Sequence, residues 1–100
     1  MEIKQRQANG EVLRLVDVRE PEEYRVARIN GATLIPMRTV PEHMDELDNG
    51  EQPLIVFCHH GVRSLQVAVW LRERGVENAQ SMAGGIDAWS ALVDESVPRY

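Results

Sequence analysis

The fold of this chain is decided by the stretch Leu54-Ile55-Val56-Phe57-Cys58-His59-His60-Gly61-Val62-Arg63-Ser64. Its first five residues are apolar throughout, which is typical of a central strand that is covered on both faces. A short turn containing Gly61 follows, and a helical pattern begins soon after it. The stretch therefore predicts a strand–turn–helix unit with Cys58 at the carboxyl end of a buried strand.

Strand and helix patterns alternate on both sides of this unit. The predicted strands cover residues 13–18, 32–35, 54–58 and 78–82. The predicted helices cover residues 2–9, 21–24, 39–49, 65–74 and 86–92. Alternation of this kind predicts an α/β fold with a mainly parallel sheet and helices on both faces. Ligands of such sheets bind beyond the carboxyl ends of the strands, which is where Cys58 lies.

Three of these helices come with more detailed expectations. Thr39 followed by Glu42 has the pattern of a capping box, so we expect the third helix to start at Thr39 and to end at Asn49-Gly50. The fourth helix should turn four apolar side chains inward: Leu65, Ala68, Val69 and Leu71. The last helix follows Gly84-Gly85 and should bury Ile86, Trp89 and Leu92.

Composition narrows the class of protein. With 100 residues, 43% hydrophobic and 27% charged, the chain is predicted to form one domain over residues 1–100. Its single cysteine cannot form an internal disulfide, and the first residues lack the apolar core of a signal peptide. No stretch approaches the length of a membrane span. We therefore expect a cytoplasmic protein.

The formal net charge is −5, and its distribution is uneven. No Lys or Arg lies between Arg38 and Arg63, whereas five acidic residues do: Glu42, Asp45, Glu46, Asp48 and Glu51. An acidic chain without a basic cluster is a poor binder of nucleic acids or membranes, so we expect neither as a partner. The acidic segment is interpreted as a solvated helix face and loop; a docking surface for a basic partner is the alternative.

The thiol of Cys58 needs help to react at neutral pH. An ordinary cysteine, with a pKa near 8.5, is only about 3% thiolate at pH 7, and a shift of two units requires roughly 2.7 kcal/mol. A helix N-terminus supplies about 0.3–2 kcal/mol. The rest of this free energy must come from the loop. Gly61 lets the backbone N–H groups point inward, and Arg63 provides a permanent positive charge. His59 and His60 can contribute as well, because histidine is partly charged near neutrality. The loop is thus suited to holding negative charge on and around sulfur.

The segment from Cys58 to Ser64 resembles the active-site loop of the rhodanese family of sulfurtransferases. Three further segments resemble the family's motifs in the same order: Asp17-Val18-Arg19 with Glu23-Tyr24, Ile29-Asn30-Gly31-Ala32 with Ile35-Pro36, and Gly84-Gly85-Ile86-Asp87-Ala88-Trp89. The resemblance implies the three-layer sandwich of that family. Two features depart from it: Arg28 stands where many members carry His, and the usual opening strand has no clear counterpart before residue 13.

The resemblance also implies a double displacement. Cys58 would take sulfur from a small anionic donor such as thiosulfate, become a persulfide, and pass the sulfur to cyanide, a thiol or a sulfur-carrier protein. The binding loop would consist of His59, His60, Gly61, Val62, Arg63 and Ser64, with Arg63 contacting the donor. The supporting residues would be Asp17, Arg19 and Glu23, with Arg19 pairing to Glu23. No cofactor is implied.

Alternatives to sulfur transfer come from the same loop. Phosphatases and arsenate reductases of this fold place five residues between Cys and Arg, whereas only four, residues 59–62, intervene here, which favours sulfur. Non-catalytic docking modules of the family commonly lack the cysteine that this chain keeps. A metal site is not expected, because the adjacent Cys58, His59 and His60 cannot readily aim at one ion and the sequence suggests no distant ligand.

Overall fold

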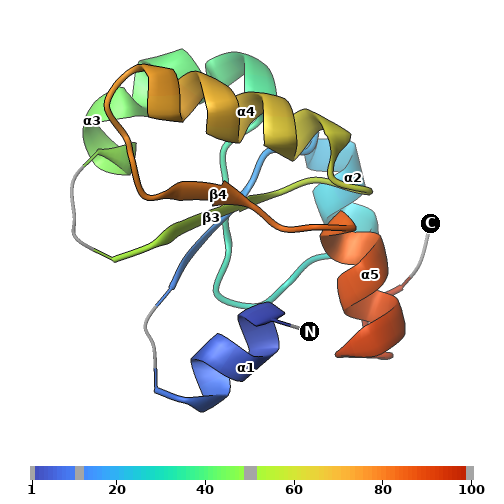
Figure 1. Cartoon of the computed structure of the whole chain (residues 1–100). Helices are drawn as coiled ribbons and strands as arrows, with labels where there is room; N and C mark the ends of the chain where they lie inside the picture. Colours follow the sequence, from blue (N-terminus) through green and yellow to red (C-terminus); the bar gives the residue numbers. More distant parts are fainter. Residues whose placement is uncertain (1, 11–12, 49–51, 99–100) are drawn as a thin grey trace.

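Strand β3 (Leu54–Phe57) lies at the centre of the computed structural model, which describes residues 2–10, 13–48 and 52–98 (Figure 1). All four of its residues are buried. It pairs with β1 (Arg14–Asp17) on one side and with β4 (Ala79–Ser81) on the other, and β1 pairs with β2 (Thr33–Leu34). The strand order is β2-β1-β3-β4 and every pairing is parallel, so the predicted parallel sheet is confirmed.

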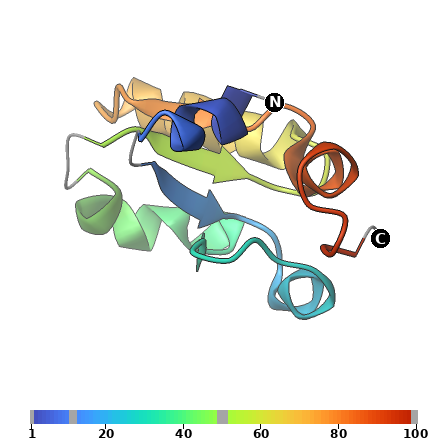
Figure 2. The ribbon, with the colours of Figure 1, turned by 90° about the horizontal axis from the view of Figure 1, so that it is seen from below.

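Helices cover both faces of this sheet, as Figure 2 shows. Successive side chains of β3 point to opposite faces, because the period of a strand is two residues. Leu54 and Val56 pack with the helices α3 (Met44–Leu47) and α4 (Val62–Glu73). Ile55 and Phe57 pack instead with α1 (Glu2–Ala8) and α5 (Gly85–Leu92). The expected three-layer α/β sandwich is thereby confirmed.

The N-terminal segment forms the helix α1, so the helix predicted for residues 2–9 is confirmed. Ile3 of this helix is buried in the same core cluster as Leu15 and Trp89. A second short helix, α2 (Pro21–Val26), starts with proline in its first turn as predicted. Among the described residues, no helix has the length and apolar character needed to cross a bilayer.

The predicted third helix is wrong in its first half. Residues Met37–His43 form a 3₁₀ helix, η1, that runs directly into α3. Thr39 lies inside η1, and its hydroxyl donates to the carbonyl of Pro36 at 2.8 Å instead of capping a helix. The helical segment starts at Met37, before the predicted position, and Pro41 has no N–H to donate to the carbonyl of Met37 as a regular α-helix would need. The predicted end at Asn49-Gly50 lies outside the described residues.

Three predicted core positions are also wrong. Leu65 and Val69 are 54% and 39% exposed, because α4 turns Ser64, Val67, Ala68 and Leu71 toward the sheet. Leu92, at the end of α5, is 74% exposed. The four acids of this segment that the structure describes are exposed, as expected: Glu42, Asp45, Glu46 and Asp48.

Candidate active site

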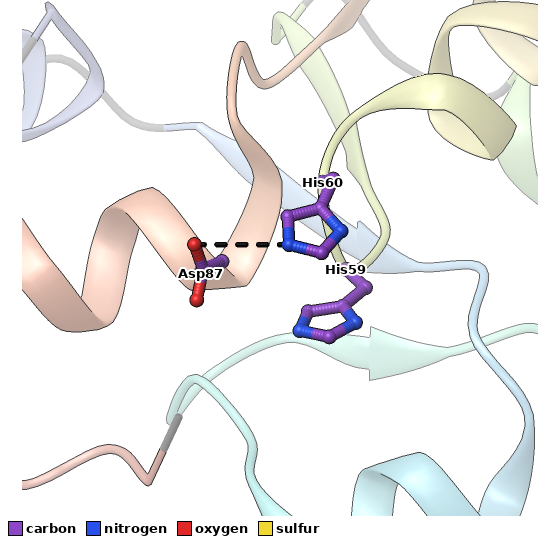
Figure 3. Close-up of side chains that lie close together, drawn as sticks. All are labelled: His59, His60 and Asp87. Carbon is purple, nitrogen blue, oxygen red and sulfur yellow. Dashed lines mark ion pairs between the residues drawn. The ribbon is translucent and has the colours of Figure 1, made fainter. Parts of the chain in front are cut away.

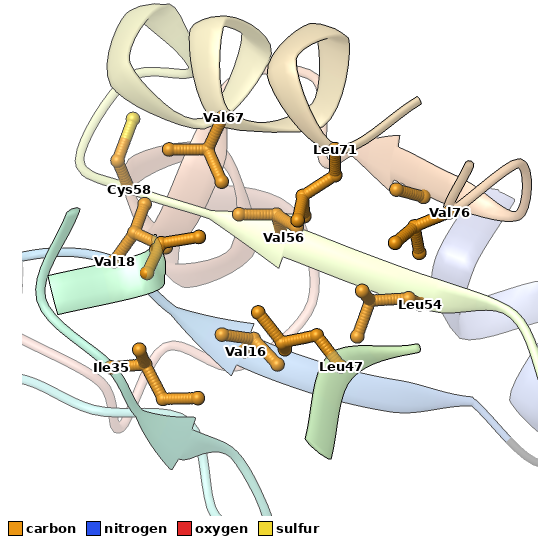
Figure 4. Packing of buried hydrophobic residues seen from close by; sticks show 12 residues of the cluster. Val16, Val18, Ile35, Leu47, Leu54, Val56, Cys58, Val67, Leu71 and Val76 are labelled. Atoms are coloured by element: carbon orange, nitrogen blue, oxygen red, sulfur yellow. The ribbon is translucent and has the colours of Figure 1, made fainter. Parts of the chain in front are cut away.

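Cys58 directly follows β3, and its side chain points toward the start of α4 (Figure 4). The residue is 1% exposed. Two backbone N–H groups donate to its sulfur: that of Gly61, with N to Sγ at 3.1 Å, and that of Ser64, at 3.4 Å. Sulfur therefore lies in a small cradle formed by the turn and the first turn of the helix, as the sequence predicts.

Gly61 makes this cradle possible. It precedes α4 with φ at 109°, in the left-handed region that residues with a side chain rarely adopt. In this conformation the chain reverses direction within the turn, so that the N–H of Gly61 points back at the sulfur of Cys58. The glycine is thus required by backbone conformation.

Ser64 adds a hydroxyl to the cradle. Its Oγ lies 3.6 Å from the sulfur of Cys58 and 2.7 Å from the hydroxyl of Ser81, which ends β4. When Ser81 donates to Ser64, the proton of Ser64 is available to a thiolate at Cys58. Sequence reasoning missed Ser81, since nothing in a short strand of mixed residues indicates which of them faces the loop.

These contacts lower the pKa of Cys58. Burial of the thiol raises its pKa, but hydrogen bonds from the Ser64 hydroxyl and from the N–H groups of Ser64, Gly61 and Arg63 outweigh burial, so the net pKa lies below the ordinary value. From the sequence, we expected loop N–H groups to add to the stabilisation of the thiolate by the helix terminus. The structure supplies them.

The side chain of Arg63 forms an ion pair with another part of the chain. Its two terminal nitrogens donate to the two carboxylate oxygens of Glu23 on α2, at 2.6 and 2.8 Å. A bidentate pair of this kind fixes both partners in one geometry. The contribution of Arg63 to the pKa of Cys58 therefore comes from its backbone N–H, and its guanidinium connects the loop to α2.

Arg19 lies wholly buried beneath α2. It forms an ion pair with the carboxylate of Asp17, with Nη2 to Oδ2 at 2.7 Å, and donates to the carbonyls of Ala27 and Glu23. The predicted contact between Arg19 and Glu23 thus involves the main chain of Glu23, while the ion pair is made with Asp17. These contacts hold α2 against the sheet and so position Glu23 to meet Arg63.

His59 and His60 lie on the other side of the loop, toward α5 (Figure 3). Their rings stack with centroids 4.0 Å apart, and Nε2 of His60 is 3.8 Å from a carboxylate oxygen of Asp87. Asp87 belongs to a motif that the sequence analysis noted, but no signal in the sequence places it beside the histidines. Val62 starts α4 and is largely exposed.

A cavity of about 500 Å³ opens on the α4 side of the sheet. Val18 and Val67 line it, and both belong to the core cluster that contains Cys58. Arg63 and Arg38 are among the residues that line it, and Trp70 and Met37 contribute apolar surface. The cavity is therefore a mainly apolar space whose lining includes two cationic side chains.

Comparisons with known proteins agree with this geometry. A model of the rhodanese-like domain family matches residues 1–92. The chain is 40% identical over 90 residues to the Arabidopsis thaliana rhodanese-like/PpiC domain-containing protein 12, chloroplastic, covering 86% of this chain but only 30% of that relative. It is 35% identical over 85 residues to thiosulfate sulfurtransferase GlpE of Pseudoalteromonas translucida, covering 85% of this chain and 80% of the relative.

Solved structures extend the match to the fold. A rhodanese-like domain protein from Staphylococcus aureus is 32% identical with a TM-score of 0.81, covering 99% of this chain and 92% of that one. A human single-domain sulfurtransferase is 30% identical with a TM-score of 0.75, covering 91% of each chain. The chain belongs to the rhodanese-like domain family.

Proposed function

We propose that this chain is a sulfurtransferase that carries sulfane sulfur on Cys58 as a persulfide. The observation that carries the proposal is the position of the thiol at the end of β3, where the N–H groups of Gly61 and Ser64 donate to it. The cradle favours the thiolate, which is the nucleophile. The name of the Pseudoalteromonas relative, a thiosulfate sulfurtransferase, suggests thiosulfate as the first donor to test.

The reaction has two steps. The thiolate of Cys58 attacks the outer sulfur of thiosulfate; a new S–S bond forms, the S–S bond of thiosulfate breaks, and sulfite leaves with the bonding electron pair. The product is a Cys58 persulfide anion. A nucleophilic acceptor then attacks its terminal sulfur, and Cys58 leaves as the thiolate that began the cycle.

The loop from His59 to Ser64 is the proposed binding site for the reacting sulfur. Gly61 and Ser64 already donate N–H groups to the thiol, and the same groups can stabilise negative charge while sulfur is transferred. This arrangement needs no cofactor, because the sulfur atom itself is the nucleophile and the carrier.

Arg63 remains our proposed contact for an anionic donor, with one refinement. Its guanidinium is engaged by Glu23, so a donor must share the guanidinium with that carboxylate or displace it. Glu23 would then set how strongly the loop attracts an anion. Asp17 and Arg19 would act indirectly, by positioning α2 and therefore Glu23.

The acceptor and the compartment complete the proposal. We propose a thiol or a sulfur-carrier protein as the acceptor, because sulfur on a buried cysteine must be collected by a nucleophile that reaches the loop. We propose the cytoplasm as the compartment, since reducing conditions keep the single cysteine available as a thiol. Localisation of a tagged full-length protein in its native cell would test the latter.

Intact-mass measurement tests the proposed function. Reduced protein incubated with thiosulfate should gain the mass of one sulfur atom, and cyanide should remove it as thiocyanate. Cys58→Ser should gain nothing. Failure of the wild-type protein to take up sulfur from thiosulfate, a persulfidated protein or mercaptopyruvate would favour a docking module instead. Release of phosphate from aryl phosphates that depends on Cys58 would favour a phosphatase.

A further inference from the structure

We propose that His59, His60 and Asp87 form a binding site for a divalent transition-metal ion such as Zn²⁺, beside the active-site loop. Each residue offers one ligand atom, and these three atoms lie within 4.8 Å of one another. Figure 3 shows the two imidazole rings and the carboxylate grouped between the loop and α5. The site goes beyond the proposed sulfur transfer and does not depend on it.

The fold fixes the main chain on which the three ligands stand. The N–H of Asp87 donates to the carbonyl of His59 at 3.1 Å, and the N–H of Ile86 donates to the carbonyl of Cys58 at 2.9 Å. Gly85 permits this close approach, because a Cβ there would lie only 2.5 Å from the carbonyl oxygen of His59. The distance between the backbones of His59 and Asp87 is thus set by the structure before any ion binds.

The donor set suits a particular class of ion. Imidazole nitrogen with one carboxylate is a ligand set typical of Zn²⁺ and similar ions, whereas Mg²⁺ and Ca²⁺ prefer sites made of oxygen alone. Bonds of about 2.0–2.2 Å to a tetrahedral zinc ion place ligand atoms roughly 3.4 Å apart, so the widest pair, within 4.8 Å, must approach by up to about 1.4 Å. Three protein ligands would leave one position for water.

His60 can make that adjustment at low cost. Its side chain is 64% exposed, so its ring can rotate out of the stack with His59 without disturbing the core. Asp87 is the more enclosed partner, and its carboxylate already lies 3.8 Å from the ring of His60. Rotation of this exposed ring is therefore one adjustment by which the group can close around an ion.

The site is separate from the thiol. Cys58 belongs to the core cluster on the α4 side of the sheet, whereas α5, which carries Asp87, packs on the other face. The sequence offered no third ligand for the two histidines; the fold supplies it from a distant helix. An ion held there would connect the active-site loop to α5.

The test is a titration of the Cys58→Ser protein, freed of metal by chelation and then desalted. Cobalt(II) is the probe, because its visible absorption reports ligand type and a thiolate ligand adds a charge-transfer band. We expect one Co²⁺ per chain with nitrogen–oxygen ligation, displaced by Zn²⁺, and a higher thermal midpoint in the presence of Zn²⁺. Using Cys58→Ser separates this result from any result on sulfur transfer.

Two ligand variants and one control, all in the same background, test the assignment of His60 and Asp87 as ligands. Loss of a residue that only hydrogen-bonds to a metal ligand typically weakens metal binding by ~10–100-fold. His60→Ala and Asp87→Asn each remove a proposed ligand itself, so each should weaken Co²⁺ binding by more than that. His60→Ala removes an exposed side chain, so its effect cannot be ascribed to misfolding. His43→Ala is the matched control, because His43 lies beside Glu46 on another surface and should leave the affinity unchanged.

Two results would overturn the proposal. One is the absence of saturable Co²⁺ or Zn²⁺ binding to the Cys58→Ser protein at millimolar ion concentration. This holds also where the wild-type protein binds the ion, because binding would then depend on the sulfur of Cys58. The other is binding that survives both His60→Ala and Asp87→Asn unchanged. In either case the histidines and Asp87 form only an ion-paired group.

Discussion

Arg63 and Glu23 form a bidentate ion pair, with nitrogen–oxygen distances of 2.6 and 2.8 Å, that joins the active-site loop to α2. The carboxylate therefore offsets the charge of the side chain proposed to attract an anionic sulfur donor. Both side chains are partly exposed, so the pair contributes modestly to stability, on the order of 1 kcal/mol or less. Its larger effect should be on donor binding.

Replacing Glu23 by Gln tests this directly. The amide oxygen can still accept from the N–H of Glu20, as the carboxylate does in the structure, but the negative charge is lost. We expect the KM for thiosulfate to fall several-fold at low ionic strength and the difference to shrink as salt is added. Glu22→Gln is the matched control, since Glu22 is exposed on the same helix. A KM that rises in Glu23→Gln would contradict a role for the pair in restraining Arg63.

Alkylation of Cys58 should report its lowered pKa. The rate with iodoacetamide, measured against pH in buffer containing a chelator, should rise with a midpoint below the ~8.5 of an ordinary thiol. Below that midpoint the thiol is protonated and the rate falls. Ser64→Ala removes one of the hydrogen bonds that lower the pKa, so its midpoint should move upward and its rate at neutral pH should drop several-fold. Urea-unfolded protein provides the unperturbed reference.

The conformation of Gly61 predicts a specific effect on sulfur uptake. Gly61→Ala places a side chain where φ is 109°, at a cost of about 1–2 kcal/mol, and disturbs the N–H that contacts sulfur. Gly75→Ala is a close control, because Gly75 has φ at 96° at the other end of α4 and nothing within 4 Å of an added Cβ. Both variants should lose similar stability in urea, but only Gly61→Ala should slow formation of the persulfide. Equal uptake by the two would show that the N–H of Gly61 is dispensable.

The buried ion pair under α2 should matter for stability more than any other charged contact described above. Asp17→Ala leaves the guanidinium of Arg19 in a fully buried place without its carboxylate, and loss of one partner of such a pair typically costs about 3–5 kcal/mol. Chemical denaturation should show the loss. The double variant Asp17→Leu, Arg19→Met removes both charges and should recover part of it. A double variant less stable than Asp17→Ala would argue that the carbonyl contacts of Arg19 dominate.

The sheet was predictable from the sequence because its signals are local. The continuous apolar run from Leu54 predicts a central strand, and the alternation around it predicts parallel neighbours. The start of the third helix was less predictable: Thr39 and Glu42 have the pattern of a capping box, but the helical segment begins at Met37, where Pro41 cannot donate the N–H of a regular α-helix. The inward face of α4 was misjudged for Leu65 and Val69, because the buried face includes a polar residue, Ser64, which an apolar pattern does not reveal.

The surroundings of Cys58 were predictable in part, because Gly61 and Ser64 are close to it in sequence and donate backbone N–H groups to its sulfur. Contacts between distant elements were not. Nothing local indicates that Arg63 meets Glu23, that Ser81 meets Ser64, or that Asp87 lies beside His60. Such pairs depend on how helices dock on the sheet, and only the assembled structure determines them.

The alternation of β3 has a last consequence for Cys58. Leu54 and Val56 face the α4 side, Ile55 and Phe57 face the other, and the next residue in the series, Cys58, joins the first group. Because side chains alternate between the two faces of the sheet, the number of residues between Leu54 and Cys58 determines on which face the sulfur lies. A deletion of one residue within β3 that kept the strand in place would turn the thiol toward α5, away from the N–H groups of the turn.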